Sequence, residues 1–401
     1  MKCVVFLGDG MADEPLKELE GKTPLEVANH PYMDMIASRG VMGIATTVPD
    51  GMSAGSDVAN LSMIGVDPKS CYTGRSPLEA VSIGVKLGEN DVTYRCNLVT
   101  LSDEDGIENK TMVDYSSGEI TSEEAAELIK SMQQKFNNDK VEFYPGVSYR
   151  HCLVLRDGKT GAKLTPPHDI SGQVIGDRYP KGENAELLLE MMKYSQEIFP
   201  EHPVNKKRIA EGKNPAISVW FWGEGTKPAL PSFKEKYGLD GAVISAVDLL
   251  YGIGISMGLD TIQVEGATGN YHTNFVGKGQ AAVEALKNGK DFVYIHMEAP
   301  DECGHQGQIE KKIWSIEQID EKVVAPVMQY LENCGEEWAV MVAPDHPTPI
   351  YTKTHSKTPV PFAYCKSSDK ADIQRKYDEK SARATGIVVE KAHELMGRLI
   401  K

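Results

Sequence analysis

Three aspartates occupy equivalent positions in this sequence, each a few residues after a short apolar run. Such runs are typical of buried strands in a parallel sheet. The carboxyl ends of parallel strands line one edge of a sheet, where ligands bind, so side chains distant in sequence meet there. We therefore predict one acidic site built from the residues that follow three strands: Asp9 after Cys3–Leu7, Asp301 after Phe292–His296, and Asp345 after Trp338–Ala343.

Histidines accompany two of these aspartates. His305 lies four residues after Asp301, His346 directly follows Asp345, and His355 comes nine residues after His346. A single aspartate after a strand is more often a turn or helix cap, and a single histidine usually has a structural role. The combination favours metal binding, because carboxylates and imidazoles together bind Mn²⁺, Zn²⁺ or Mg²⁺.

Ser56 is the candidate nucleophile. It lies in a Gly-rich and Ser-rich segment, directly before a helical pattern that runs from Asp57 to Ile64. The N-terminus of a helix presents free N–H groups and a dipole that favour an anion. An ordinary Ser N-cap is the alternative that local sequence leaves open. Ser53, one turn earlier, is the competing nucleophile.

The number of candidate ligands indicates two metal ions. With Ser56 there are seven candidates, which exceeds what one ion needs. Paired ions clamp the attacking and leaving oxygens of a phosphoryl transfer, and a hydroxyl bound to a metal loses its proton more readily. The sequence therefore predicts metal-assisted phosphoryl transfer with Ser56 as the phosphate carrier.

The rest of the chain predicts an α/β fold with a mainly parallel sheet flanked by helices, because strand-like and helical patterns alternate. We expect a core of residues 1–90 and 226–401, interrupted by an inserted, smaller α/β lid domain of residues 91–225. In the core the expected strands include Ala242–Ile244 and Thr261–Val264, and the expected helices are Val247–Met257, Gln280–Lys287 and Ile313–Leu331. In the insertion we expect the strands Tyr94–Leu101, Ser148–Leu155 and Ala216–Trp222, the helices Glu123–Phe136 and Glu183–Ile198, and a polar loop Pro200–Asn214.

Composition restricts the class of protein. The 401 residues are 41% hydrophobic and 25% charged, as in a soluble globular protein of two or three domains. No apolar run approaches the roughly 20 residues that span a bilayer. A net charge of −15 argues against nucleic acid as a partner but allows a small anionic substrate. Seven widely spaced cysteines without a CxxC pair fit a reducing cytoplasm.

Together these motifs resemble the alkaline phosphatase superfamily and, more closely, the archaeal-type branch of the cofactor-independent phosphoglycerate mutases. The resemblance covers essentially the whole chain. It is carried by Gly8-Asp9-Gly10, Gly55-Ser56-Asp57, Asp301-x-x-x-His305, Asp345-His346 and His355, with further matches at Gly65-Val66-Asp67-Pro68, Gly74-Arg75-Ser76-Pro77 and Val147-Ser148-Tyr149-Arg150-His151.

The resemblance implies an alkaline-phosphatase-like core with two metal ions, manganese being favoured over zinc and magnesium. One ion would be held by Asp301, His305 and His355, the other by Asp9, Ser56, Asp345 and His346. Ser56 would take the phosphoryl group of 3-phosphoglycerate and return it to the other hydroxyl, giving 2-phosphoglycerate. The lid would exclude water and bind the substrate through Arg150, His168 and Asp169, and Arg75 on the core side would reach the phosphate.

Other functions fit the same core. A homoserine kinase-like phosphotransferase is the first, although no phosphate-binding loop for ATP is present. A metal-dependent phosphatase or phosphodiesterase and a non-catalytic metal-binding protein are further alternatives. The chain also has Ser76 where the mutases tend to have glycine, and the tryptophans Trp220 and Trp222 are unexpected. The sequence shows no obligate protein partner.

Overall fold

The structure, a computed structural model, describes residues 1–371 and 373–401 and divides them into two compact units. We call residues 1–72 with 229–401 the core unit, and residues 73–228 the inserted unit. Residues 73–90 thus belong to the inserted unit, in contrast to the boundary expected at residue 90. The reason is that helix α5 (Ser76–Ser82) is tied to strand β3 (Val92–Leu101), where the Ser76 hydroxyl donates to the Thr93 carbonyl at 3.0 Å.

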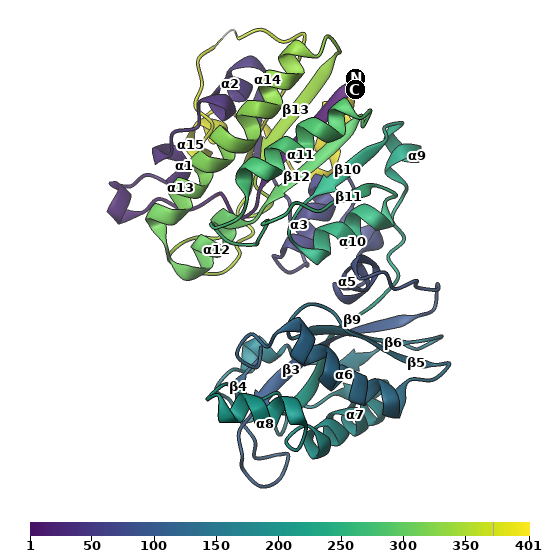
Figure 1. Ribbon diagram of the computed structural model, residues 1–401. Coiled ribbons are helices and arrows are strands. Elements are labelled where there is room, and N and C mark those ends of the chain that lie inside the picture. Colours follow the sequence, from purple (N-terminus) through teal and green to yellow (C-terminus); the bar gives the residue numbers. More distant parts are fainter. Residues whose placement is uncertain (372) are drawn as a thin grey trace. The chain divides into compact units, whose positions relative to one another are not determined.

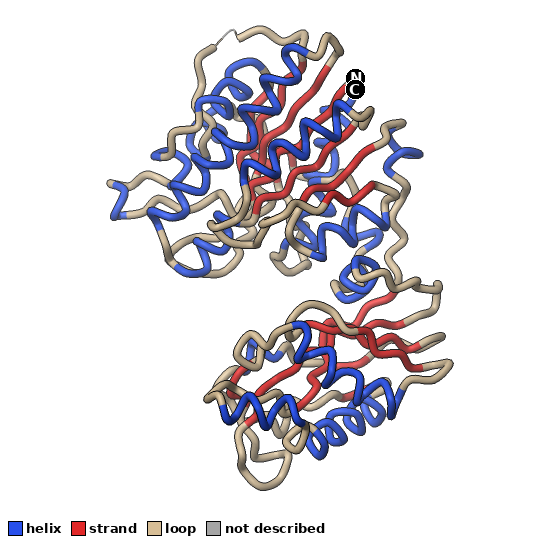
Figure 2. The backbone as a smooth tube through the Cα atoms, in the orientation of Figure 1, coloured by secondary structure: helices blue, strands red, loops and turns tan. Residues whose placement is uncertain are grey.

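An eight-stranded sheet forms the centre of the core unit (Figures 1 and 2). Its order is β11-β10-β12-β1-β13-β14-β2-β15. The first five strands are parallel, which confirms the mainly parallel sheet, while β14 runs antiparallel to both its neighbours. The strand bounds are β11 Asp260–Ile262, β10 Gly241–Ile244, β12 Phe292–Met297, β1 Lys2–Gly8, β13 Trp338–Ala343, β14 Val360–Lys366, β2 Val41–Ala45 and β15 Val388–Val389.

Helices cover both faces of this sheet, and for this reason every residue of β1, β12 and β13 is buried. On one face, Val4 and Phe6 of β1 share a core with helices α2 (Pro31–Arg39), α11 (Phe275–Lys287), α13 (Ile309–Ile319) and α14 (Ala325–Asn333). On the other face lie α3 (Ser56–Met63) and α10 (Asp248–Ser256). No helix among the described residues is long and apolar enough to cross a membrane.

The predicted helix Ile313–Leu331 is part of a longer helix that contains a π-helical turn. Helices α13 and α14 are joined by Asp320–Val324 in π-helical conformation. The Asp320 carboxylate accepts the backbone N–H groups of Tyr32 at 3.2 Å and Met33 at 2.8 Å. It therefore caps the first turn of α2, whose N–H groups lack partners within that helix.

The inserted unit has its own sheet and its own core. Strand β3 lies between β6 (Arg150–Leu155) and β9 (Ser218–Thr226), and all described pairings of this sheet are antiparallel. The expected loop Pro200–Asn214 is wrong in part, because Pro203–Ala210 form helix α8. His202 caps this helix, and the buried Arg208 donates to the Ser117 and Asn214 carbonyls. Helices α6 (Ser122–Phe136) and α7 (Ala185–Ile198) match the prediction.

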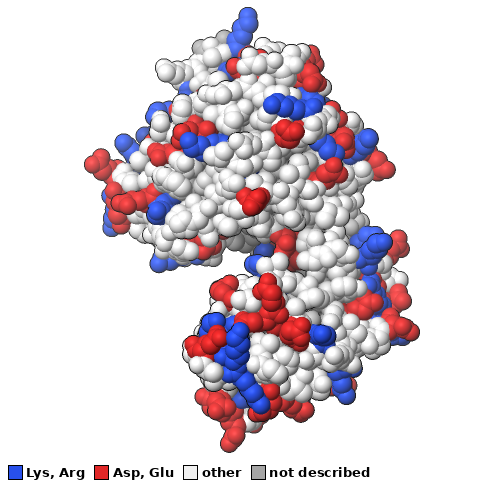
Figure 3. All heavy atoms as spheres, in the orientation of Figure 1, with Lys and Arg blue, Asp and Glu red and all other residues white. Residues whose placement is uncertain are grey.

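Charged side chains are mixed over the face that Figure 3 shows, where Lys and Arg groups lie among Asp and Glu groups. Ion pairs such as Lys206–Glu201 and Lys213–Glu211, both 2.7 Å, are of this kind. All seven cysteines are free, as the sequence predicted.

A buried ion pair braces the loops that follow β1 and β13. The Lys312 ammonium contacts the Asp13 carboxylate at 2.7 Å, and both side chains are fully buried. Lys312 also donates to the carbonyls of Ala12 at 3.2 Å and Thr348 at 2.9 Å. Asp13 in turn accepts the N–H of Ile350 at 3.2 Å. One lysine from α13 thus holds together two loops that carry candidate metal ligands.

Replacing Lys312 with Ala should destabilise the protein strongly, because Asp13 would remain buried without its counter-charge. Removing one partner of a buried pair costs about 3–5 kcal/mol. Urea unfolding followed by circular dichroism measures this loss. The exposed Lys380→Ala variant is the control and should stay within about 0.5 kcal/mol of wild type. Equal stability of the two variants would contradict the bracing role.

Candidate functional site

The three predicted aspartates meet at the carboxyl edge of three adjacent strands. Strands β12, β1 and β13 are neighbours in the sheet. Asp9 and Asp345 lie in the loops after β1 and β13, and Asp301 lies in the first turn of helix α12 (Ala299–Gln306), which follows β12. The structure therefore brings together residues that are up to 336 positions apart, as expected for the open edge of a parallel sheet.

Asp9, Asp345, His346 and Ser56 form the first of two groups. The ligand atoms of the three acidic and imidazole side chains lie within 4.8 Å of one another, and all three residues are buried. His346 Nε2 lies 3.6 Å from Asp9 Oδ1 and 3.4 Å from Asp345 Oδ2. The Ser56 Oγ is 3.1 Å from the same Nε2. Four side chains thus point toward a common position.

Asp301, His305 and His355 form the second group. The Nε2 atoms of His305 and His355 face each other at 3.0 Å. The Asp301 carboxylate lies 3.2 Å from His305 and 3.4 Å from His355. The His305 Nδ1 is 2.9 Å from the Lys353 carbonyl, which only accepts hydrogen bonds. A neutral ring therefore keeps its proton on Nδ1 and turns the Nε2 lone pair toward His355, an arrangement suited to a shared cation.

Electrostatics shows the same need for positive charge. Burial raises the pKa of Asp9 well above its usual value, and the nearby carboxylates of Asp345 and Asp301 raise it further. Contact with Asp301 raises the pKa of His305 to about 9, against the opposing effect of burial. Burial is also the main cause that lowers the pKa of His346. The neighbouring carboxylates of Asp345 and Asp301 thus disfavour the charge of Asp9, and a divalent cation would relieve that repulsion.

Hydrogen bonding tests whether a metal ion fits here. The Asp9 Oδ1 is buried and has no hydrogen-bond partner among the described residues. Buried polar atoms are nearly always satisfied, so this orphaned oxygen indicates a ligand that the protein side chains do not replace. The donor set of carboxylate, imidazole and hydroxyl suits Mn²⁺, Zn²⁺ or Mg²⁺. The residues therefore fit a divalent metal site.

Three residues that the sequence did not single out hold the ligands in place. The Asn60 amide donates to Asp345 Oδ2 and to the Ser56 carbonyl, both at 2.9 Å, and accepts from the Tyr294 hydroxyl at 2.7 Å. The Thr348 hydroxyl donates to Asp301 and lies 3.4 Å from His346 Nδ1. The one sequence signal for Asn60 was its spacing: it lies one helical turn after Ser56 on α3, so both side chains lie on the same face of that helix.

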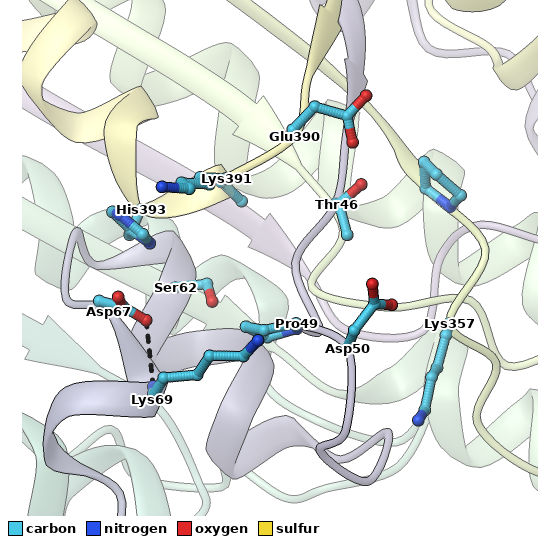
Figure 4. A pocket seen from close by; sticks show the side chains of 12 residues that line it. Thr46, Pro49, Asp50, Ser62, Asp67, Lys69, Lys357, Glu390, Lys391 and His393 are labelled. Atoms are coloured by element: carbon cyan, nitrogen blue, oxygen red, sulfur yellow. Dashed lines mark hydrogen bonds between the residues drawn. The ribbon is translucent and has the colours of Figure 1, made fainter.

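Ser56 lies at the N-terminus of helix α3, as the sequence predicted, and Gly55 rather than Ser56 is the N-cap. The competing Ser53 is exposed and lies before the helix. Ser62, further along the same helix, lines a separate pocket of about 590 Å³ with Lys391 and His393 (Figure 4). None of the seven candidate ligands lines that pocket. The geometry therefore favours Ser56 over Ser53 as the nucleophile.

The inserted unit gathers cationic side chains around one glutamate. Arg75 and Arg95 each contact the Glu79 carboxylate, at 2.8 and 2.7 Å. Burial raises the pKa of Glu79, but the guanidinium groups of Arg95 and Arg75, with a smaller effect of Arg150, lower it below its usual value. The Arg95 guanidinium also lies 4.0 Å from the centre of the Trp222 ring. Arg95, on a strand, was missed because nothing in its local pattern marks it.

The other expected substrate residues lie near this cluster. The His168 ring is 5.0 Å from that of Trp222, and its pKa is lowered mainly by burial, with Arg95 and Arg75 contributing. Asp169 is exposed and 3.6 Å from His168. The departures from the mutase pattern have structural roles here: Ser76 is buried against Thr93, and the Trp220 indole donates to the Thr165 carbonyl.

Comparison with known proteins decides the family. The family model for 2,3-bisphosphoglycerate-independent phosphoglycerate mutase matches residues 37–205. A probable enzyme of that name from Geobacter sulfurreducens is 52% identical over 402 residues, covering all of both chains. The chain belongs to this family. The Methanosarcina barkeri member is 48% identical, again over all of both chains.

Solved structures agree with the family. A Pyrococcus horikoshii protein is 29% identical with a TM-score of 0.83, covering 100% of this chain and 96% of its own. The cofactor-independent phosphoglycerate mutase of Thermoplasma acidophilum is 25% identical with a TM-score of 0.65, covering 100% of this chain and 99% of its own. The mixed α/β fold described above is therefore the fold of this mutase family.

The Asp9→Asn variant separates electrostatic repulsion from metal binding. In EDTA the variant loses both the repulsion from Asp345 and Asp301 and the contact with His296, so its own metal-free melting temperature serves as the baseline. Excess Mn²⁺ should raise the wild-type value, since a ligand at 100 times its Kd adds about 2.7 kcal/mol, and should raise the variant less. Differential scanning calorimetry measures both, with the exposed Asp50→Asn as control. An equal gain in Asp9→Asn and wild type would exclude Asp9 as a ligand.

Proposed function

We propose that this chain is a cytoplasmic enzyme that interconverts 3-phosphoglycerate and 2-phosphoglycerate without 2,3-bisphosphoglycerate. The observation that carries the proposal is the convergence of Ser56 with six Asp and His side chains in a chain 52% identical to a probable mutase of this kind. Manganese is the favoured ion at both groups, with zinc or magnesium as alternatives. When bound, the ions would help the Ser56 hydroxyl lose its proton and would offset charge on the phosphoryl oxygens.

Ser56 carries the phosphoryl group between the two hydroxyls of the substrate. Its Oγ attacks the phosphorus of 3-phosphoglycerate, so the Ser–O–P bond forms as the bond to the C3 oxygen breaks. The C3 oxygen gains one proton for the one that Ser56 loses. The C2 hydroxyl of glycerate then attacks the phosphoserine, loses its proton and restores the Ser56 hydroxyl. The start of α3 favours the anionic phosphoryl group throughout.

The arginine cluster of the inserted unit suits the anionic groups of such a substrate. Guanidinium groups bind carboxylate and phosphate oxygens through two parallel hydrogen bonds. Glu79 holds Arg75 and Arg95 in fixed positions, while Arg150 is exposed. We assign Arg75, Arg150, His168 and Asp169 to substrate binding, and we assign to this unit the exclusion of water, which would otherwise hydrolyse the phosphoserine.

Relatives favour the mutase over the other functions that the sequence left open. The curated proteins reported above are named phosphoglycerate mutases, and they match the whole chain rather than the core alone. A homoserine kinase, a phosphatase or a non-catalytic metal-binding protein has no comparable support. The acceptor is therefore glycerate in this proposal.

Replacing Ser56 with Ala should abolish the mutase reaction, because the phosphoryl group then has no carrier. We expect a loss of at least about 10³-fold in kcat. The assay couples formation of 2-phosphoglycerate from 3-phosphoglycerate to enolase, in Mn²⁺ and without 2,3-bisphosphoglycerate. Ser53→Ala is the matched control and should retain activity. Full activity of Ser56→Ala, or phosphorylation of homoserine by ATP in place of isomerisation, would contradict the proposal.

Arg150→Lys tests the inserted unit as the substrate-binding part. The lysine keeps the positive charge but loses the paired N–H groups, so we expect the KM for 3-phosphoglycerate to rise by about tenfold. The same enolase-coupled assay measures it. Arg178→Lys, a comparable change at an exposed arginine paired with Asp177, should leave KM unchanged. A KM that is the same in both variants would remove Arg150 from the substrate site.

A further inference from the structure

A row of four charged side chains leads through the buried interior of the core unit to Asp9. Lys278 of α11 contacts Glu298 at 3.2 Å, Glu298 contacts His296 Nδ1 at 3.1 Å, and His296 Nε2 contacts Asp9 Oδ2 at 3.0 Å. Lys278 and His296 are fully buried, and Glu298 and Asp9 are 5% and 3% exposed. Basic and acidic groups alternate along the row, so each charge is offset by its neighbours.

The orientation of the His296 ring is set mainly from its Nδ1 side. Each ring nitrogen faces a carboxylate, and an ionised carboxylate only accepts hydrogen bonds. Nδ1 lies 3.1 Å from the Glu298 carboxylate, within hydrogen-bond distance. Nε2 is in ion-pair contact with Asp9 Oδ2 at 3.0 Å and has no hydrogen-bond partner among the described residues. The Ser245 hydroxyl lies 3.1 Å from His296 Nδ1 and donates to Glu298 at 3.0 Å, and Lys278 also donates to the His296 carbonyl at 2.9 Å. The ring has little freedom to turn.

The fixed ring determines which oxygen of Asp9 is free. Oδ2 faces His296, whereas Oδ1 has no hydrogen-bond partner among the described residues and lies 3.6 Å from His346 Nε2. With Oδ2 in ion-pair contact with His296, the carboxylate presents Oδ1 toward the group formed with Asp345 and His346. Groups that orient a ligand in this way are part of what sets metal affinity.

We propose that His296 is a positioning residue for a divalent cation at the Asp9–Asp345–His346 group, and that Glu298 and Lys278 hold it in that role. This inference rests on the proposed function, which places a metal ion at this group. Asp301, in the second group, is held instead by the Thr348 hydroxyl and the two histidines. The row therefore acts on one of the two ions and leaves the other unaffected.

Binding of Mn²⁺ to the full chain, stripped with EDTA and followed by isothermal titration calorimetry, tests the inference. His296→Leu removes both N–H groups, and Glu298 keeps Lys278, Ser245 and the Ala246 N–H as partners. We expect one of two Mn²⁺ ions to bind about 10- to 100-fold more weakly and the other as in wild type. His296→Gln places an amide N–H where Nε2 was, so most of the affinity should return.

His30→Ala is the matched control, because His30 is also buried in the core unit and pairs with an aspartate, Asp34, at 3.1 Å. It should lower the melting temperature without changing either Mn²⁺ affinity. The inference is overturned if His296→Leu binds both ions as wild type does, or if His296→Gln is as weak as His296→Leu. Tighter binding in both His296 variants would also overturn it, since the ring's charge rather than its position would then dominate. Wild-type protein that binds no Mn²⁺ would overturn the proposed metal site itself.

Discussion

Repulsion among three carboxylates is the constraint on which the rest of the site depends. Strands β12, β1 and β13 lie side by side, so Asp301, Asp9 and Asp345 share one edge of the sheet, and the first and last of these disfavour the charge of Asp9. Neighbouring groups offset this in part, through His305 and His355 at Asp301 and through Gly10 N–H and Asn60 at Asp345. The offset is incomplete at Asp9, whose Oδ1 has no hydrogen-bond partner among the described residues, and a divalent cation would supply the missing charge.

A comparison within one loop shows that the missing hydrogen-bond partner is particular to Asp9. Asp13 lies four residues after Asp9 and is also buried, but it contacts Lys312 and accepts N–H groups from Glu14 and Ile350. The same loop thus satisfies one buried aspartate completely and leaves an oxygen of the other without a partner. A structural carboxylate and a ligand carboxylate can be told apart here by their hydrogen bonds rather than by burial.

Sequence patterns predicted the strands and helices that position the ligands, because strands buried on both faces are unbroken apolar runs. Asp9, Asp301 and Asp345 were predictable because each follows such a run, and His305 because it lies one helical turn after Asp301. Asn60, Thr348 and His296 were not, since their roles depend on partners more than 200 residues away or on another loop. The boundary near residue 73 was missed because it depends on packing of α5 against β3. Helix α8 was missed because it depends on the contacts of the buried Arg208.

The two groups differ in how far water reaches them. Asp9, Asp345 and His346 are at most 3% exposed, whereas the side chains of His305 and His355 are 34% and 23% exposed. A cation in the first group could leave only if the surrounding loops opened, while one in the second could exchange ligands directly with solvent water. Ions bound at the two groups would therefore exchange with solvent at different rates, the first slowly and the second quickly.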